Sequence, residues 1–190
     1  ALRMTVSNLP ATTGDEEKIK TVEKSEKILN DMHREVRAVA FNLMPQTLIQ
    51  YGLVPALQEM ASRLQESTGV VVKISSFDLQ QRLSEVQEIS MYRIVQEWIN
   101  NVLKYAEATK IEVDLVADDD EIRLTIEDNG KGFDPEILVN ANGNGWKNIQ
   151  SRLHLLKGSI ELDSMKGRQG TTLMLEIPKD KEPAIILEQA

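Results

Sequence analysis

The stretch from Met91 to Tyr105 reads MYRIVQEWINNVLKY, and its two-faced pattern constrains the fold more than any other feature of the sequence. If it is a helix, with about 100° between successive residues, its polar side chains gather on one stripe: Ser90, Arg93, Glu97, Asn100, Asn101 and Lys104. The apolar side chains on the other side require a core: Met91, Val95, Trp98, Ile99 and Val102. A carboxylate and a carboxamide one turn apart, beside a lysine, are suited to binding a cation and a phosphate. Taken alone, the stripe also fits the solvated face of a surface helix.

The composition limits the classes of partner. The chain has 190 residues, 41% of them hydrophobic, which is enough for a substantial core. Its net charge is −8, concentrated after Glu66, which argues against a nucleic-acid surface. Any anion bound there needs backbone amides, a metal or single cations. The chain has no cysteine, no apolar run that would span a bilayer and no signal-peptide pattern, so we expect a cytoplasmic location.

The first third of the chain predicts helices. Apolar residues recur at intervals of three and four over 15–43 and again over 53–64, and the segment 1–9 is typical of the end of an earlier helix. We therefore expect a helical hairpin before Met44 whose apolar edge packs against another copy of the chain. A further helix at 53–64 is expected to turn Leu57, Met60, Ala61 and Leu64 inward, and 1–65 as a whole is expected to be a helical dimerisation domain. The domain boundary is expected near Glu66.

After the expected boundary, helices and strands alternate. The expected elements are a strand at 70–74, a helix at 82–105, strands around 111–115 and 122–126, a helix at 145–156, and strands around 160–162 and 173–177. The strands alternate apolar and polar residues, as in a sheet with one buried face. This order predicts an α+β domain over 66–180, with helices on one face of a mixed sheet, followed by a tail at 181–190.

The strand around 122–126 leads into a loop rich in glycine, which reads DNGKGFD from Asp128. Asp128 is in phase with the inward Ile126, so its carboxylate needs a hydrogen-bond donor, and the exocyclic amine of a purine would supply one. Gly130 and Gly132 permit positive φ and the close approach of a flat ligand. The same residues also fit an ordinary Asx-type turn.

Two further glycine pairs follow this loop. Gly143 and Gly145 precede the expected helix at 145–156, where free backbone amides favour a phosphate. Gly167 and Gly170 precede Thr171 at the start of the last strand. Each pair alone fits a plain loop or hairpin turn, and the order of the pairs carries more information than any one of them.

In this order the motifs resemble the ATP-binding domain of the GHKL superfamily, which includes sensor histidine kinases, chaperones, topoisomerases and repair proteins. The motifs are Glu97…Asn101, Asp128-x-Gly130-x-Gly132, Gly143-x-Gly145 and Gly167-x-x-Gly170-Thr171. The likeness covers about Arg82 to Pro178 and implies a two-layer α/β sandwich, the Bergerat ATPase fold. The segment 35–57 is similar to the second dimerisation helix and linker of sensor histidine kinases, in particular those related to nitrate/nitrite sensors.

The resemblance implies ATP and Mg²⁺ as ligands and gives each motif a role. Asn101 would coordinate Mg²⁺, Glu97 would position water or accept a proton, and Lys104 would contact phosphate. In the adenine site, Asp128 would accept the base amine, with Gly130, Gly132, Gly170 and Thr171 around it. Gly143 and Gly145 would hinge a lid over the phosphates.

The resemblance also implies an ATP-dependent protein-histidine kinase. The γ-phosphoryl group would pass to a histidine before residue 1 and then to an aspartate of a response regulator. The chain would dimerise through its helical segment, would not bind nucleic acid directly, and would meet a membrane only through regions outside 1–190. His33 does not match the acceptor motif, and His154 has no metal-ligand spacing to a partner.

Two residues depart from the pattern of the family. Tyr105 stands where that kinase subfamily more often has histidine, and Trp146 stands where the lid usually has a smaller aliphatic residue. Three alternatives therefore stay open. They are another GHKL ATPase or serine kinase of the anti-sigma type, a degenerate non-catalytic sensor that acts as a dimerisation module, and an unrelated α/β domain with coincidental glycine loops.

Overall fold

The computed structural model describes Lys24 and residues 45–79, 82–140 and 144–180. The chain divides into two units, Ala1–Met44 and Pro45–Ala190, and the elements described below belong to the second. The expected helices before residue 44 and the tail at 181–190 lie outside the described residues, apart from Lys24. No helix of the described part is long and apolar enough to cross a membrane.

The described strands form one mixed sheet in the order β1-β2-β3-β5-β4. Its strands are β1 (Val71–Phe77), β2 (Lys110–Ala117), β3 (Glu121–Asp128), β4 (Ser159–Ser164) and β5 (Thr171–Pro178). β1 pairs parallel with β2, and the other neighbours pair antiparallel. In the register, Asp128 at the end of β3 lies opposite Thr171 at the start of β5. The pairing therefore brings two of the predicted site residues together at one end of the sheet.

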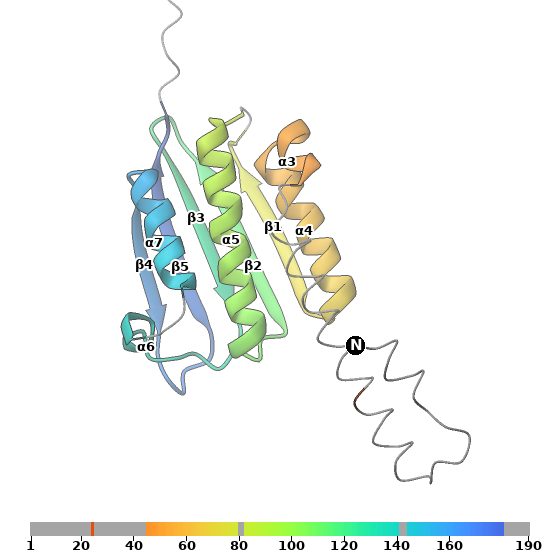
Figure 1. The fold of residues 1–190 in the computed structure, drawn as a ribbon, viewed down its shortest axis with the longest axis vertical. Helices are drawn as coiled ribbons and strands as arrows, with labels where there is room; N and C mark the ends of the chain where they lie inside the picture. Colours follow the sequence, from red (N-terminus) through yellow and green to blue (C-terminus); the bar gives the residue numbers. More distant parts are fainter. Residues whose placement is uncertain (1–23, 25–44, 80–81, 141–143, 181–190) are drawn as a thin grey trace, which may run out of the picture. The chain divides into compact units, whose positions relative to one another are not determined.

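The alternation in the sequence gives the sheet one buried face. The inward side chains of β2, β3 and β5 are almost inaccessible to solvent: Ile111, Val113, Leu115, Ile122, Leu124, Ile126, Leu173, Leu175 and Ile177. The intervening residues are mostly polar and more exposed, as expected for a strand with one face in water. The prediction of helices on one face of a mixed sheet is confirmed (Figure 1).

The helices are α3 (Gln46–Tyr51), α4 (Leu53–Thr68), α5 (Glu85–Tyr105), α6 (Glu136–Asn140) and α7 (Gly145–Leu155). α5 lies across the middle of the sheet, α7 lies beside it over β4 and β5, and α4 lies on the β1 side (Figure 1). α6 lies near the end of the sheet toward which α5 runs and from which α7 starts (Figure 1). The short helices α3 and α6 were not predicted from the sequence.

The central helix α5 begins at Glu85 rather than at the expected residue 82. Ser84 is extended and caps the helix, its side chain accepting a hydrogen bond from the Gln87 N–H at 3.3 Å. The apolar stripe expected for this helix is confirmed, because Met91, Val95, Trp98, Ile99 and Val102 are all buried. Polar residues of this helix are buried as well, namely Gln87, Glu88, Ser90 and Gln96, because α5 lies on the sheet between α4 and α7 (Figure 1).

Arg82, left outside the helix, ties α5 to α3. Its guanidinium donates to both carboxylate oxygens of the buried Glu88, at 2.8 and 2.7 Å. It also donates to the carbonyl oxygens of Leu48, Ile49 and Gln50 near the end of α3, at 3.3 to 3.5 Å. The Leu48 carbonyl also accepts from the Gly52 N–H at 3.1 Å. The last carbonyls of a helix lack donors from within it, so a cation there both offsets the negative end of the helix dipole and supplies donors.

α3 and α4 pack with the sheet rather than apart from it. α4 lies against β1 and α5, with Leu57, Met60, Ala61 and Leu64 inward as the sequence predicts. The compact unit therefore starts at Pro45, whereas the sequence places the domain boundary near Glu66. The apolar residues of 53–64 thus belong to the core of this unit. The assignment of 1–65 to dimerisation stays a prediction.

Candidate functional site

A cavity of about 400 Å³ opens between α5, α6, α7 and the end of the sheet. The residues that line it are Trp98, Asn101, Val102, Tyr105, Ala106, Asp128, Lys131, Gly132, Phe133, Ile137, Leu138, Gly145, Trp146 and Thr171. The spacing of its α5 residues places Trp98, Asn101, Val102 and Tyr105 on a single stripe of that helix. The lining is mainly apolar with a few polar groups, as is typical of a small-molecule site.

Asp128 is the most deeply placed charge in this cavity. It is 8% exposed, and its Oδ1 accepts a hydrogen bond from the Gly130 N–H at 2.7 Å. Burial raises the pKa of Asp128 above its usual value, although the Gly130 hydrogen bond acts in the opposite direction. A carboxylate keeps acceptor capacity beyond this one bond, so Asp128 can accept a donor from a ligand in the cavity.

Two glycines hold the loop after β3 in a shape that no other residue fits. Gly132 has φ of +64°, and a methyl group there would meet the backbone carbonyls of Arg168 and Met165. A methyl group at Gly130 would meet the carbonyl and side chain of Ala106, at the end of α5. The positive φ expected at both glycines is found at Gly132 and not at Gly130, and both positions lie close to the protein's own atoms. The close approach of a flat ligand stays a prediction.

The third glycine pair joins this loop from the other side. Gly170 has φ of +90°, and its N–H donates to the Gly130 carbonyl at 2.7 Å. Thr171, which is 2% exposed, pairs its hydroxyl with that of Ser164 at 2.9 Å. Ser164 in turn accepts from the Phe133 N–H at 3.0 Å, so the strand ends and the loop form one network. This network fixes the Thr171 hydroxyl beside Asp128 across the sheet register.

Asn129 anchors the same loop to the start of β2. Its side-chain oxygen accepts from the N–H groups of Thr109 and Lys110, both at 2.9 Å, and its side-chain nitrogen donates to the Thr109 hydroxyl at 2.8 Å. The sequence analysis missed this role and that of Ser164. No local signal identifies either residue, because their partners lie far away in the chain.

The opposite end of the cavity joins α5 to the start of α7. A methyl group at Gly145 would lie 2.5 Å from Oε1 of Glu97 and 3.5 Å from Nδ2 of Asn101. The carboxylate and the carboxamide predicted from one turn of α5 thus meet the N-terminus of α7 at a single point. Backbone N–H groups at such a terminus carry partial positive charge and bind anions. This end is suited to a phosphate.

Three aromatic rings form one wall of the cavity. Trp98 lies 6.4 Å from Phe133 and 6.2 Å from Trp146 between ring centroids, tilted by 48° and 56°. The sequence placed Trp98 in the core, and it is 3% exposed, but it also lines the cavity. Trp146 packs against it from the start of α7.

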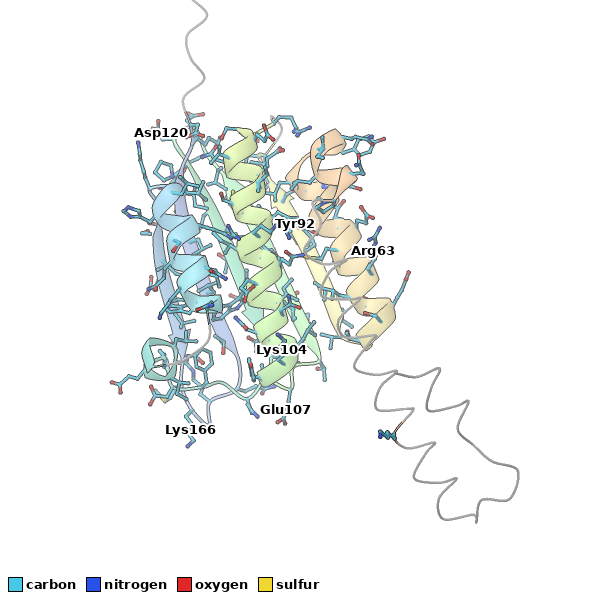
Figure 2. All side chains as sticks on the ribbon, in the orientation of Figure 1. Arg63, Tyr92, Lys104, Glu107, Asp120 and Lys166 are labelled. Atoms are coloured by element: carbon cyan, nitrogen blue, oxygen red, sulfur yellow. The ribbon has the colours of Figure 1, made fainter. Side chains whose placement is uncertain are left out.

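The structure brings most of the predicted site residues together. Asn101, Asp128, Gly132, Gly145 and Thr171 line the cavity, while Gly130 and Gly170 lie in the adjoining turn and Glu97 contacts the Gly145 position. Lys104 is exposed on the last turn of α5 and is not one of the lining residues (Figure 2). Gly143 lies outside the described residues. Tyr105 lines the cavity with 68% of its surface exposed.

The cavity offers few metal-binding oxygens, so it suits a cation that is also bound by the oxygens of a ligand. Among the described residues, no group of three or more His, Cys, Asp and Glu side chains could hold a metal ion. Asn101 offers one carboxamide oxygen at the anion end, beside the Glu97 carboxylate. Mg²⁺ commonly binds through one or two protein oxygens together with water and substrate phosphates, so these residues fit it in company with a phosphate ligand.

Comparison with known proteins gives a family for this arrangement. Residues 86–181 match the family described as histidine kinase-, DNA gyrase B- and HSP90-like ATPase. The sensor histidine kinase MctS of Rhizobium johnstonii is 32% identical over 161 residues, covering 84% of this chain and 34% of MctS. The signal transduction histidine-protein kinase/phosphatase DegS of Brevibacillus brevis is 30% identical over 165 residues, covering 87% of this chain and 42% of DegS. The chain thus spans less than half the length of these relatives.

A solved structure supports the fold. The nucleotide-free catalytic domain of the histidine kinase ThkA superposes with a TM-score of 0.55 at 13% identity, over 67% of this chain and 90% of that one. The resemblance to the GHKL domain and to sensor histidine kinases is confirmed, whereas the narrower likeness to nitrate/nitrite sensors stays a prediction. The family model matches, and the motifs predicted from the sequence enclose one cavity. The chain therefore belongs to the histidine kinase-, DNA gyrase B- and HSP90-like ATPase family.

Proposed function

We propose that the cavity binds ATP with Mg²⁺ and that the chain is the kinase core of a sensor histidine kinase. The observation that carries the proposal is the placement of Asp128. It is a buried carboxylate with spare acceptor capacity, at the end of a mainly apolar cavity opposite the N-terminus of α7. A flat, amine-bearing base with phosphates at its far end matches both ends of such a cavity.

Each end of the cavity then has its own task in binding. Asp128 accepts the exocyclic amine of adenine, and the buried Thr171 hydroxyl lies beside it. Val102, Ala106 and the glycine turn supply a surface against which the base packs. The start of α7 at Gly145 receives the phosphates. A guanine base carries a carbonyl acceptor where adenine carries its amine, so the Asp128 carboxylate would repel it.

The anion end supplies the groups that phosphoryl transfer requires. Asn101 is the proposed ligand of Mg²⁺, which would neutralise phosphate charge there. Glu97, one turn before Asn101, is proposed to orient the attacking group or to accept its proton. Lys104, at the exposed end of α5, is proposed to contact phosphate from outside the cavity. Such transfer depends on positioning and charge neutralisation more than on covalent help from the protein.

The wider function of the protein follows from the relatives. MctS and DegS are a sensor histidine kinase and a histidine-protein kinase/phosphatase. We propose that the γ-phosphoryl group passes to a histidine outside residues 1–190 and then to an aspartate of a response regulator. We further propose a cytoplasmic location and a homodimer formed through the helical segment within 1–65, with no direct contact to nucleic acid.

A second candidate is a sensor that binds nucleotide without transferring phosphate. Two observations favour it: Trp146 packs on Trp98 inside the cavity, and Tyr105 occupies the position where that kinase subfamily more often has histidine. This candidate predicts nucleotide binding of ordinary strength without phosphoryl transfer. A chain extended upstream to include its histidine decides between the two, since only the kinase acquires radiolabel from γ-labelled ATP.

Calorimetric titration with a non-hydrolysable ATP analogue, with Mg²⁺ and then with EDTA, tests the binding proposal. We expect saturable binding that weakens without Mg²⁺. Asn101→Ala is expected to abolish the Mg²⁺ dependence, and Asp128→Ala to weaken binding in both conditions. Normal Mg²⁺-dependent binding by Asn101→Ala would show that the metal assignment is wrong. If the wild-type chain binds no nucleotide in either condition, the proposed function fails.

A further inference from the structure

One polar atom in the wall of the cavity has no partner. Among the residues that the structure describes, the indole Nε1 of Trp98 is the one buried side-chain nitrogen or oxygen without a hydrogen bond. Trp98 is 3% exposed and lines the cavity. A buried unpaired N–H group destabilises a folded protein, and native structures contain few of them, so this one calls for a physical reason.

The position of Trp98 along α5 shows which part of a ligand would meet it. The Asp128 end of the cavity lies at Ala106, which contacts the Gly130 turn and accepts from the Lys131 N–H at 2.9 Å. Trp98 precedes Ala106 by two turns of helix, about 12 Å along the axis. It is therefore at the other end, with Asn101, Gly145 and Trp146.

We propose that the Trp98 indole N–H donates a hydrogen bond to a phosphate oxygen of the bound nucleotide, so that the donor is satisfied only when the cavity is occupied. The proposal rests on the proposed function, since it assumes a nucleotide whose base lies at Asp128. Trp98 then binds the ligand, although its place in the apolar stripe of α5 predicts only a core residue. A donor aimed at a charged oxygen makes a stronger bond than one between neutral groups.

The aromatic wall determines how the contact forms. Because Nε1 is not accessible to water, one of the two rings packed on Trp98 must shift before a phosphate reaches the N–H. Phe133 and Trp146 are both half-buried and belong to segments at the rim of the cavity, so either ring can move without disturbing the sheet. Nucleotide binding is therefore expected to change the surroundings of both tryptophans, which are the chain's two indoles.

The decisive variant is Trp98→Phe, which keeps an aromatic ring and removes the N–H. We expect its affinity for ADP to fall about tenfold to a hundredfold, the size of one hydrogen bond to a charged group. Its affinity for adenosine, which lacks phosphate, is expected to fall by less than about threefold. Its resistance to urea is expected to change little, because the removal of an unpaired donor offsets the volume that the smaller ring leaves unfilled. Trp146→Phe, the matched indole removal, is expected to show a smaller difference between ADP and adenosine.

Indole N–H signals in ¹⁵N–¹H NMR spectra give an independent readout, assigned with the same two variants. The Trp98 signal is expected to move downfield on addition of ADP and much less on addition of adenosine. The inference is overturned if the wild type binds ADP while Trp98→Phe binds it equally well. It is also overturned if ADP and adenosine lose affinity equally, which would mean that the ring only packs against the base. Absence of ADP binding by the wild type would instead count against the proposed function.

Discussion

Replacement of Asp128 by asparagine separates the recognition of adenine from the stability of the fold. The substitution preserves the size of the side chain and an oxygen that can accept from the Gly130 N–H, which lies 2.7 Å from Oδ1. It replaces the remaining carboxylate oxygen with an amide NH₂, which is a donor. An adenine amine approaching from the cavity would then meet a donor where it needs an acceptor. We expect nucleotide affinity to fall while the protein stays folded.

The size of the loss follows from the bond that is removed. A hydrogen bond to a charged group contributes about 1.5–3 kcal/mol, which corresponds to a loss of about tenfold to a hundredfold in affinity for ADP. Stability should change in the opposite direction, because burial penalises the ionised carboxylate and raises the pKa of Asp128. A neutral amide in the same place does not carry that penalty.

The pH dependence of stability gives a second test of the direction in which Asp128→Asn changes the free energy of unfolding. Because the pKa of Asp128 in the folded state lies above its unfolded value, the folded protein holds this proton to higher pH than the unfolded chain does. The stabilisation from Asp128 is therefore fully present below the unfolded pKa and is lost as pH rises through the folded pKa. The stability of Asp128→Asn relative to wild type should accordingly increase from acid conditions toward neutral pH and then level off.

Titration calorimetry with ADP at neutral pH, together with urea unfolding across the acid range, measures both effects. Asp134→Asn is the matched control, because Asp134 is an exposed aspartate of the same loop whose side chain accepts from the Glu136 N–H, at 3.0 Å. It is expected to bind ADP as the wild type does. The reasoning is refuted if Asp128→Asn binds ADP with unchanged affinity, or if it loses affinity only because it unfolds.

The remaining predictions concern the glycines and the arginine that shape the site. Gly132→Ala is expected to lower the free energy of unfolding by about 2 kcal/mol or more, because the position has a left-handed φ and a methyl group there would clash with backbone. Gly167 has φ of +85° but open space around it, so Gly167→Ala should lower the free energy of unfolding by about 1 kcal/mol. If urea unfolding shows the same loss of stability for both variants, the clash at Gly132 is refuted. Gly145→Ala should preserve the free energy of unfolding or raise it by up to about 1 kcal/mol, because alanine has the higher helix propensity. It should slow phosphoryl transfer in the upstream-extended chain, because the added methyl group displaces the Glu97 carboxylate. An unchanged rate would argue against a role for Glu97 there. Arg82→Ala should speed hydrogen exchange of the amides of α3, since the carbonyls of Leu48, Ile49 and Gln50 each lose the Arg82 donor, although Leu48 keeps the Gly52 N–H. Unchanged protection would show that packing alone holds that helix.

Most of the fold was predictable because its elements are long and strongly periodic. The strands β2, β3 and β5 alternate over eight residues each, and α5 runs for 21 residues with a clear apolar stripe. α3 and α6 have only six and five residues, too few for a period to appear. α3 in addition depends on Arg82, whose hydrogen bonds to it cross more than 30 residues of chain. Such a tertiary contact leaves no trace in the local pattern.

The residues of the site also fall into those that the sequence predicts and those that it does not. Asp128 and the glycines were predictable, because a buried carboxylate at a strand end and residues with positive φ have local signatures. Ser164 and Asn129 were not, since their roles arise from pairing between distant segments. Trp98 was assigned to the core from its helical phase, and it is buried there. Its position in the cavity wall depends on where α7 stops covering α5, which the sequence of α5 alone does not indicate.

Discrimination between adenine and guanine nucleotides tests most directly whether Asp128 determines what this cavity binds. Calorimetric titration of the wild-type chain with ADP and with GDP, in the same Mg²⁺ buffer, compares an amine donor with a carbonyl acceptor at one position of the base. We predict that ADP binds at least about tenfold more tightly than GDP, and that Asp128→Asn loses most of this preference. Equal affinity of the wild type for ADP and GDP, or no binding of either, would contradict the assignment of the cavity as an adenine nucleotide site.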